Sequence, residues 1–185
     1  MNMRKLLWCP VIAIVMLLSG PAAHAQLNSA TTSVSLSATL AESLSVTASP
    51  STVSFTLLPS GTATGNASVS IVTTWVLKTT RTTVKTYAYF ANATSALTDG
   101  GTPANLIASS DVYGSINSGT NTAFTGASPF AAASSLTVFS LTIASGNANR
   151  NSSHTDTLGL TIDTTGDNLP AATYTGTLII QAQAI

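Results

Sequence analysis

Apolar and hydroxyl-bearing side chains alternate along most of this chain. The longest such row has Val69, Ile71, Thr73, Trp75 and Leu77 at every second position. A period of two places successive side chains on opposite faces of a strand, and threonine suits the exposed face of a sheet. No window has convincing helical periodicity, so the sequence predicts an all-β fold.

The first 25 residues are typical of an export signal. Arg4 and Lys5 precede an apolar run over residues 6–18, and Ala23-His24-Ala25 offers the small residues that a signal peptidase requires. We expect cleavage after Ala25, which leaves residues 26–185 as one domain. The apolar run is too short to cross a bilayer, so we expect no membrane span in the mature chain. The expected location is secreted or at the cell surface, with the periplasm as an alternative.

Charge and cysteine content exclude several functions. Without residues 1–25 the chain keeps four basic and six acidic residues, a net charge of −2, which does not attract nucleic acid. The single cysteine, Cys9, lies in the leader, so the mature chain cannot form disulfides, thiolate metal sites or a thiol nucleophile. We therefore expect no cofactor, and stability from packing alone.

The alternating rows and the turn residues between them predict about eight or nine strands, at spacings typical of a single β-sandwich. Residues 91–110 and 117–133 are rich in small and polar residues and are predicted to be surface loops. The pattern does not decide which face of residues 82–90 is buried. The predicted strands cover residues 34–40, 44–46, 53–57, 69–77, 82–90, 112–116, 136–143, 154–163 and 174–184.

The apolar members of these rows should form the core. We expect five of them to be buried: Ile71, Trp75, Leu160, Leu178 and Ile180.

Candidate catalytic and metal-binding groups are few. His154, beside Ser152, Ser153 and Asp156, lacks the Gly-x-Ser-x-Gly elbow of an α/β hydrolase, and we interpret it as part of a solvated turn. Three residues have the oxygen ligands that calcium prefers, but their spacing suits an ordinary turn better, and we predict no metal site. They are Asp163, Asp167 and Asn168. The sequence thus predicts a protein that is not an enzyme.

One strip of side chains could bind a ligand. Arg81, Lys85, Tyr87 and Tyr89 combine positive charge with aromatic rings, which can stack on sugars or hold an anionic partner. The alternative is a plain sheet face, since exposed Tyr and Lys are ordinary on strands.

The closing segment, residues 169–178 with the sequence Leu-Pro-Ala-Ala-Thr-Tyr-Thr-Gly-Thr-Leu, runs into an apolar last strand. It resembles the end of secreted bacterial pilin-like and spore-coat-U-like proteins. The resemblance implies an immunoglobulin-like β-sandwich, and assembly in which a subunit lends an extended N-terminal strand to its neighbour. It carries over no functional residues to this chain.

An alternating segment lies where such a donated strand would be expected. Val34, Leu36, Ala38 and Leu40 put four apolar side chains on one face, enough to fill a groove in another subunit. The alternative is that these residues form the first strand of their own sandwich.

The function that the sequence favours is non-enzymatic. We expect an extracellular structural or adhesive protein, such as a pilin-like subunit of a surface fibre that self-associates through its N-terminal strand. The alternative is a secreted carbohydrate-binding module that recognises a surface glycan through the strip around Tyr87 and Tyr89.

Overall fold

The structure is a computed structural model that describes residues 27–126, 130 and 135–185. The expected signal peptide, residues 1–25, lies outside the described residues. The chain divides into two units, Met1–Thr39 and Leu40–Ile185. The described part of the first unit, residues 27–39, contains no strand, and all its residues are exposed. The compact unit thus begins at Leu40, inside the region that we expected to be one domain from residue 26.

The second unit is all-β, as predicted, with antiparallel pairing throughout its ladders. Within the described residues it has eleven strands, four of them only two or three residues long. The strands are β1 Ser43–Ser49, β2 Thr62–Thr64, β3 Val69–Val76, β4 Thr83–Tyr89, β5 Leu97–Thr98, β6 Leu106–Ile107, β7 Val112–Ile116, β8 Thr122–Ala123, β9 Ser135–Thr142, β10 Asn151–Asp163 and β11 Ile179–Ala184. A short 3-10 helix, η1, covers Ser109–Asp111.

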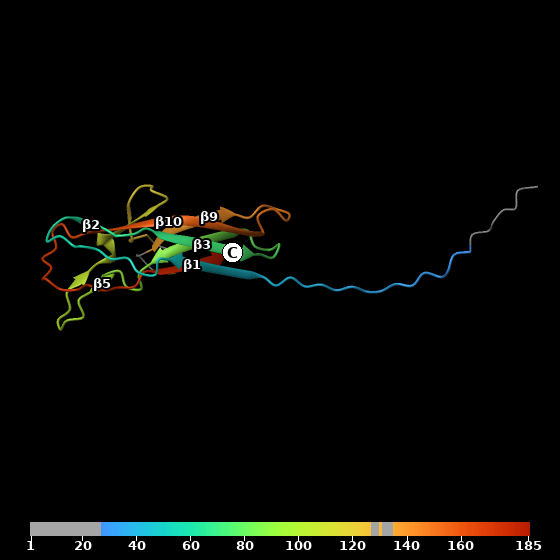
Figure 1. The fold of residues 1–185 in the computed structure, drawn as a ribbon, viewed down its shortest axis with the longest axis horizontal. Helices are drawn as coiled ribbons and strands as arrows, with labels where there is room; N and C mark the ends of the chain where they lie inside the picture. The colour runs from blue at the N-terminus through green and yellow to red at the C-terminus, as the bar shows by residue number, and fades with distance from the viewer. Residues whose placement is uncertain (1–26, 127–129, 131–134) are drawn as a thin grey trace, which may run out of the picture. The chain divides into compact units, whose positions relative to one another are not determined.

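The strands form three sheets, and Figure 1 shows the long strands along one direction with β2 and β5 at one end. Sheet A has the order β1-β3-β10-β7-β8, with β2 also paired to β10. Sheet B has the order β11-β4-β9, and sheet C is the pair β5-β6. Strands far apart in sequence are therefore neighbours, as β3 and β10 are in sheet A.

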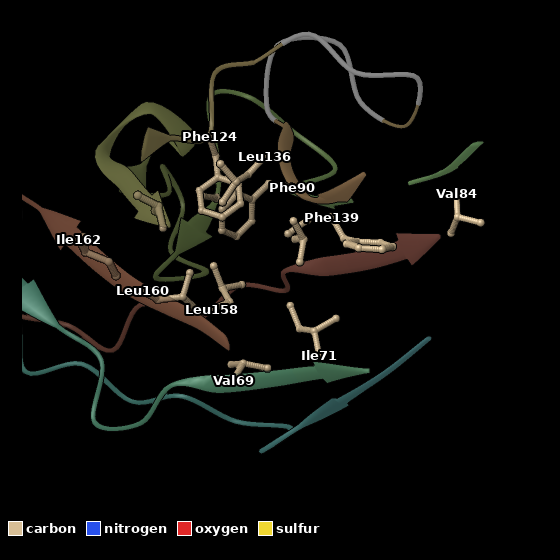
Figure 2. Packing of buried hydrophobic residues seen from close by; sticks show 14 of the residues in the cluster. Val69, Ile71, Val84, Phe90, Phe124, Leu136, Phe139, Leu158, Leu160 and Ile162 are labelled. Carbon is tan, nitrogen blue, oxygen red and sulfur yellow. The ribbon is translucent and has the colours of Figure 1, made fainter. Parts of the chain in front are cut away.

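Side chains from sheets A and B share one core. Figure 2 shows Val69 and Ile71 of β3 near Leu158 and Leu160 of β10, with Phe139 of β9 on the same cluster. The alternation in β3 leads to this packing, because every second residue of that strand points inward and is buried. Burial of apolar side chains contributes on the order of 25 cal/mol per Å², which is the main favourable term available to a chain without disulfides.

The predicted core is confirmed for three of its five residues. Trp75, Ile71 and Leu160 are buried, whereas Leu178 and Ile180 are only half-buried. The last two lie before and in β11, an edge strand that is covered on one side only. The prediction of full burial for them was therefore wrong.

The two predicted loops contribute to the core. Ile107 and Phe124 are fully buried, and the Phe124 ring meets the Phe90 ring edge-on at a centroid distance of 5.1 Å. In β4 the structure decides the buried face, because Val84 and Ala88 point into the core. The composition around Ile107 and Phe124 predicted surface loops, but tertiary packing places both side chains in the core.

Gly176, in the segment before β11, lies against a neighbouring backbone. A Cβ atom at this position would overlap the carbonyl oxygen of Ala96. Beside it, Thr175 exchanges two backbone hydrogen bonds with Thr98, of 2.8 and 2.9 Å. The glycine therefore allows the closing segment to approach β5 closely.

Candidate assembly site

Strand β11 is paired on one edge only. Its residues pair with β4, from Ile179 opposite Tyr89 to Ala184 opposite Val84. Among the described strands, none pairs with the other edge. We call this second side the open edge of β11. An edge of this kind presents unpaired backbone N–H and C=O groups to which another strand can add.

The hydrogen-bond pattern shows which residues face the open edge. Thr83 and Ile185 exchange two backbone hydrogen bonds, of 2.9 and 3.1 Å, so they form a hydrogen-bonded pair of the antiparallel ladder. Bonded and non-bonded pairs alternate in such a ladder. The backbone groups of Ile180, Ala182 and Ala184 therefore point away from β4, toward the open edge.

Half-buried apolar side chains surround this edge. On β11 and just before it, Leu178, Ile180 and Ala184 pack against the core without being fully covered. In sheet A, Leu44 and Val46 of β1 have the same partial burial, and so do the apolar residues of the following segment, 53–57. Cα atoms of β1 and β11 come within 8 Å of each other. The core is thus incompletely covered where these two edge strands meet.

Arg81, in the connection between β3 and β4, links Glu42 just before β1 to the end of β11. Arg81 donates from Nε to Glu42 Oε1 at 2.9 Å and from Nη2 to Glu42 Oε2 at 3.3 Å. Its Nη1 donates to the carbonyl oxygen of Ala184 at 3.2 Å. The hydrogen bond from Arg81 lowers the pKa of Glu42. We call this group, Arg81 with Glu42 and the Ala184 carbonyl, the clasp.

The predicted donor residues lie outside every strand. Val34, Leu36 and Leu40 have exposed fractions of 80%, 92% and 79%, and Ala38 is also exposed. The alternative, in which residues 34–40 form the first strand of their own sheet, does not match this structure, because the first strand begins at Ser43. These apolar side chains remain without burial in a single copy.

The predicted binding strip is only partly assembled. Tyr87 is 7% exposed, and the ring of Phe130 packs edge-on against it at 5.2 Å and stacks on Tyr89 at 6.0 Å. Lys85 is half-buried on the same strand, while the Arg81 guanidinium is engaged in the clasp. Of the two tyrosines, Tyr87 is therefore covered, whereas Tyr89 is half-buried.

The predicted solvated turn around His154 belongs to strand β10. His154 Nε2 lies 3.2 Å from Asp156 Oδ1, and the imidazole stacks on Phe139 with a centroid distance of 4.2 Å. Asn117 donates to the same Asp156 oxygen at 2.8 Å. His154 is exposed, as predicted, but it lies in a strand and not in a turn, and Asp156 is only 3% exposed. No hydrogen bond from Ser152 or Ser153 to this pair occurs in the described structure.

The three candidate calcium ligands lie at the end of β10 and after it. Asp163 Oδ1 accepts a hydrogen bond from the backbone N–H of Thr165 at 3.0 Å, as in an ordinary Asx turn. Burial raises the pKa of Asp167, with further contributions from the charges of Asp111 and Asp163. Among the residues that the structure describes, no three His, Cys, Asp or Glu side chains are placed to hold a metal ion.

Comparison with models of known protein families, with curated proteins and with solved structures finds no match. In the described part of the chain, no helix has the length and apolarity needed to cross a membrane.

Sequence reasoning assigned Arg81 to a ligand-binding strip and missed Glu42. The two residues are separated by 39 positions, and neither belongs to a motif. No signal in a single sequence could have joined them.

Proposed function

We propose that this chain is an extracellular structural subunit that self-associates, with residues 27–40 of one copy pairing with the open edge of β11 in another. The single observation that carries the proposal is the coexistence, in one chain, of an unpaired strand edge over half-buried apolar residues and an exposed apolar segment outside the fold.

The strand order supports an immunoglobulin-like sandwich with one position open. An immunoglobulin constant-type domain has sheets in the order A-B-E-D and C-F-G. The order β1-β3-β10-β7 follows the first of these, with β8 added beside β7, and β4 with β11 takes the places of C and F, with β9 added beside β4. No described strand takes the place of G beside β11. A strand from a second copy would complete that sheet.

A tyrosine before β11 supports the same sandwich. The Tyr174 hydroxyl donates to the carbonyl oxygen of Pro170 at 3.0 Å, four residues upstream. A tyrosine near the start of strand F makes this type of backbone contact in many immunoglobulin-like domains.

The donor segment has the chemistry that the open edge needs. Alternation from Val34 to Leu40 places apolar side chains on one face and Ser or Thr on the other. Added to β11, the apolar face would cover half-buried residues such as Ile180 and Leu44, while the backbone groups of Ile180 and Ala182 would gain partners. The hydrophobic effect and β pairing would then favour the same association. The export signal expected in residues 1–25 supports an extracellular location.

The test compares the mature chain, residues 26–185, with a chain that begins at Ala41. We expect the first to form polymers in light scattering and the second to remain monomeric. A synthetic peptide of residues 31–40 should bind the shorter chain and raise its melting temperature. At a free peptide concentration of about a hundred times Kd, the free energy of unfolding should increase by about 2.7 kcal/mol.

A peptide with Leu36→Asp is the matched control, because it keeps length and backbone but puts a charge on the apolar face. It should not raise the melting temperature. A mature chain that is monomeric at all concentrations, with amides of residues 34–40 protected from exchange, would show that the segment folds onto its own β11 and would refute the proposal.

A further inference from the structure

We propose that the clasp ends the open edge of β11 and thereby sets the register in which the donor segment pairs with it. This inference rests on the proposed function and assigns Arg81 and Glu42 a positioning role in assembly.

The clasp occupies the last pairing position of the open edge. The Ala184 carbonyl points to this edge, and Arg81 Nη1 already donates to it at 3.2 Å. An incoming strand that bonds to the Ala184 carbonyl competes with a guanidinium that two further hydrogen bonds hold on Glu42. Charge-assisted bonds in this forked geometry are stronger than neutral ones. The positions that remain for pairing are Ile180 and Ala182.

The clasp also limits the space for a strand. Neighbouring strands lie about 4.8 Å apart, so a strand between β1 and β11 needs about 9.6 Å between them. Their Cα atoms now come within 8 Å, and Glu42 immediately precedes β1 while Ala184 ends β11. A donor strand can therefore enter only if the two edges separate, and Arg81, which bridges Glu42 and the Ala184 carbonyl, resists their separation at this end. A donor strand has to enter from the end near Ile180 and stop at the clasp.

The donor sequence needs such a stop, because its own pattern defines the register weakly. A slip of one residue would expose the apolar face and is strongly disfavoured. A slip of two residues keeps the faces correct and only exchanges Val34 for Leu36, or Leu36 for Ala38, at a given position. Such exchanges change the binding free energy little in a half-exposed site. The side chains therefore do not distinguish registers two residues apart, whereas a fixed end point does.

The absence of cysteine after Cys9 allows the register to be mapped by disulfides. One mature copy carries Gln181→Cys, on the outer face of β11, where its backbone points to β4. A second mature copy carries one cysteine on the Ser/Thr face of the donor segment. The four donor variants place this cysteine at Ser33, Ser35, Ser37 or Thr39. Cross-strand cysteines bond only when their Cβ atoms are about 3.5 to 4.5 Å apart, so each disulfide reports one register.

With the clasp intact, we expect one donor position to give most of the disulfide. In Arg81→Gln and in Glu42→Gln, the disulfide should spread over positions two residues apart. Lys85→Gln is the matched control, since it removes a positive charge from β4 without affecting the clasp, and it should retain the single register. Trp75 fluorescence checks that every variant is folded.

Three results would overturn the inference. An unchanged single register in both clasp variants would show that other contacts set the register. Several registers in the intact protein would show that no stop exists. No disulfide at any donor position, with all variants folded, would refute the proposed function and this inference with it.

Discussion

The hydroxyl groups of Thr73 in β3 and Thr86 in β4 lie 2.8 Å apart, in a buried hydrogen bond that joins sheet A to sheet B. Thr73 is 1% exposed and Thr86 is fully buried, so neither hydroxyl can turn to solvent. The two sheets are therefore joined in the interior by a polar contact whose partners depend on each other.

This pair should behave non-additively. Thr73→Val or Thr86→Val alone leaves a buried hydroxyl without its partner, which should lower the free energy of unfolding by about 1 to 3 kcal/mol. The double variant replaces both hydroxyls by methyl groups of similar shape and should cost less than the sum of the two. Urea unfolding of all four proteins measures this coupling. Additive losses would contradict the interpretation.

Trp75 should be the largest single contributor to the core. It is 1% exposed, its ring stacks on Phe139 at 5.8 Å, and its Nε1 donates to the carbonyl oxygen of Asn149 at 2.6 Å. Trp75→Ala should lower the free energy of unfolding by about 3 to 5 kcal/mol, as truncations of large buried aromatics do. Trp75→Phe, which keeps an aromatic ring, should lose less. Circular dichroism during urea unfolding measures both, and an unchanged midpoint for Trp75→Ala would refute its burial.

Asp167 and Asp163 should have opposite effects on stability at neutral pH. Burial and neighbouring charges raise the pKa of Asp167, so its ionisation disfavours the folded state once the pH exceeds the ordinary value near 3.8. Hydrogen bonds from Thr165 lower the pKa of Asp163, so its ionised form stabilises the fold, and that contribution is lost as the pH falls through the lowered value.

We therefore expect Asp167→Asn to raise the melting temperature at pH 7 and Asp163→Asn to lower it. At pH values well below 3.8, where Asp167 is protonated in both states, the gain from Asp167→Asn should disappear. Thermal unfolding of the two variants and the parent protein between about pH 2.5 and pH 7, an interval that spans the ordinary aspartate pKa of about 3.9, measures the effect. A stabilisation by Asp167→Asn that persists at the acid end would show that charge is not its cause.

The alternating pattern predicted the seven longer strands because a period of two is a local property, but it was wrong for residues 34–40 and 53–57 and missed the four short strands. Val69 and Ile71 point inward as soon as β3 is a strand, whichever strand pairs with it. In the same way, Leu158, Leu160 and Ile162 share a buried face in β10 because they alternate along that strand. The absence of helical periodicity likewise determined the fold class.

The tertiary structure decided everything that depends on a partner strand. Residues 34–40 alternate as well as β3 does, yet they lie outside the sheets, because alternation defines an apolar face without supplying a surface to cover it. Leu178 and Ile180 are half-buried for the related reason that β11 lies at an edge.

By itself, the sequence determined that this protein forms strands, which side chains share a face in β3 and β10, and that no cysteine after residue 9 can crosslink them. Only the tertiary structure decided that Phe124 fills the core from a stretch with loop composition, and that Arg81 meets Glu42 beside the open edge of β11. The physical reason is the separation along the sequence between the residues that interact. Side-chain direction along a strand follows from backbone geometry within a few residues, whereas these contacts join distant segments whose proximity depends on how the whole set of strands packs.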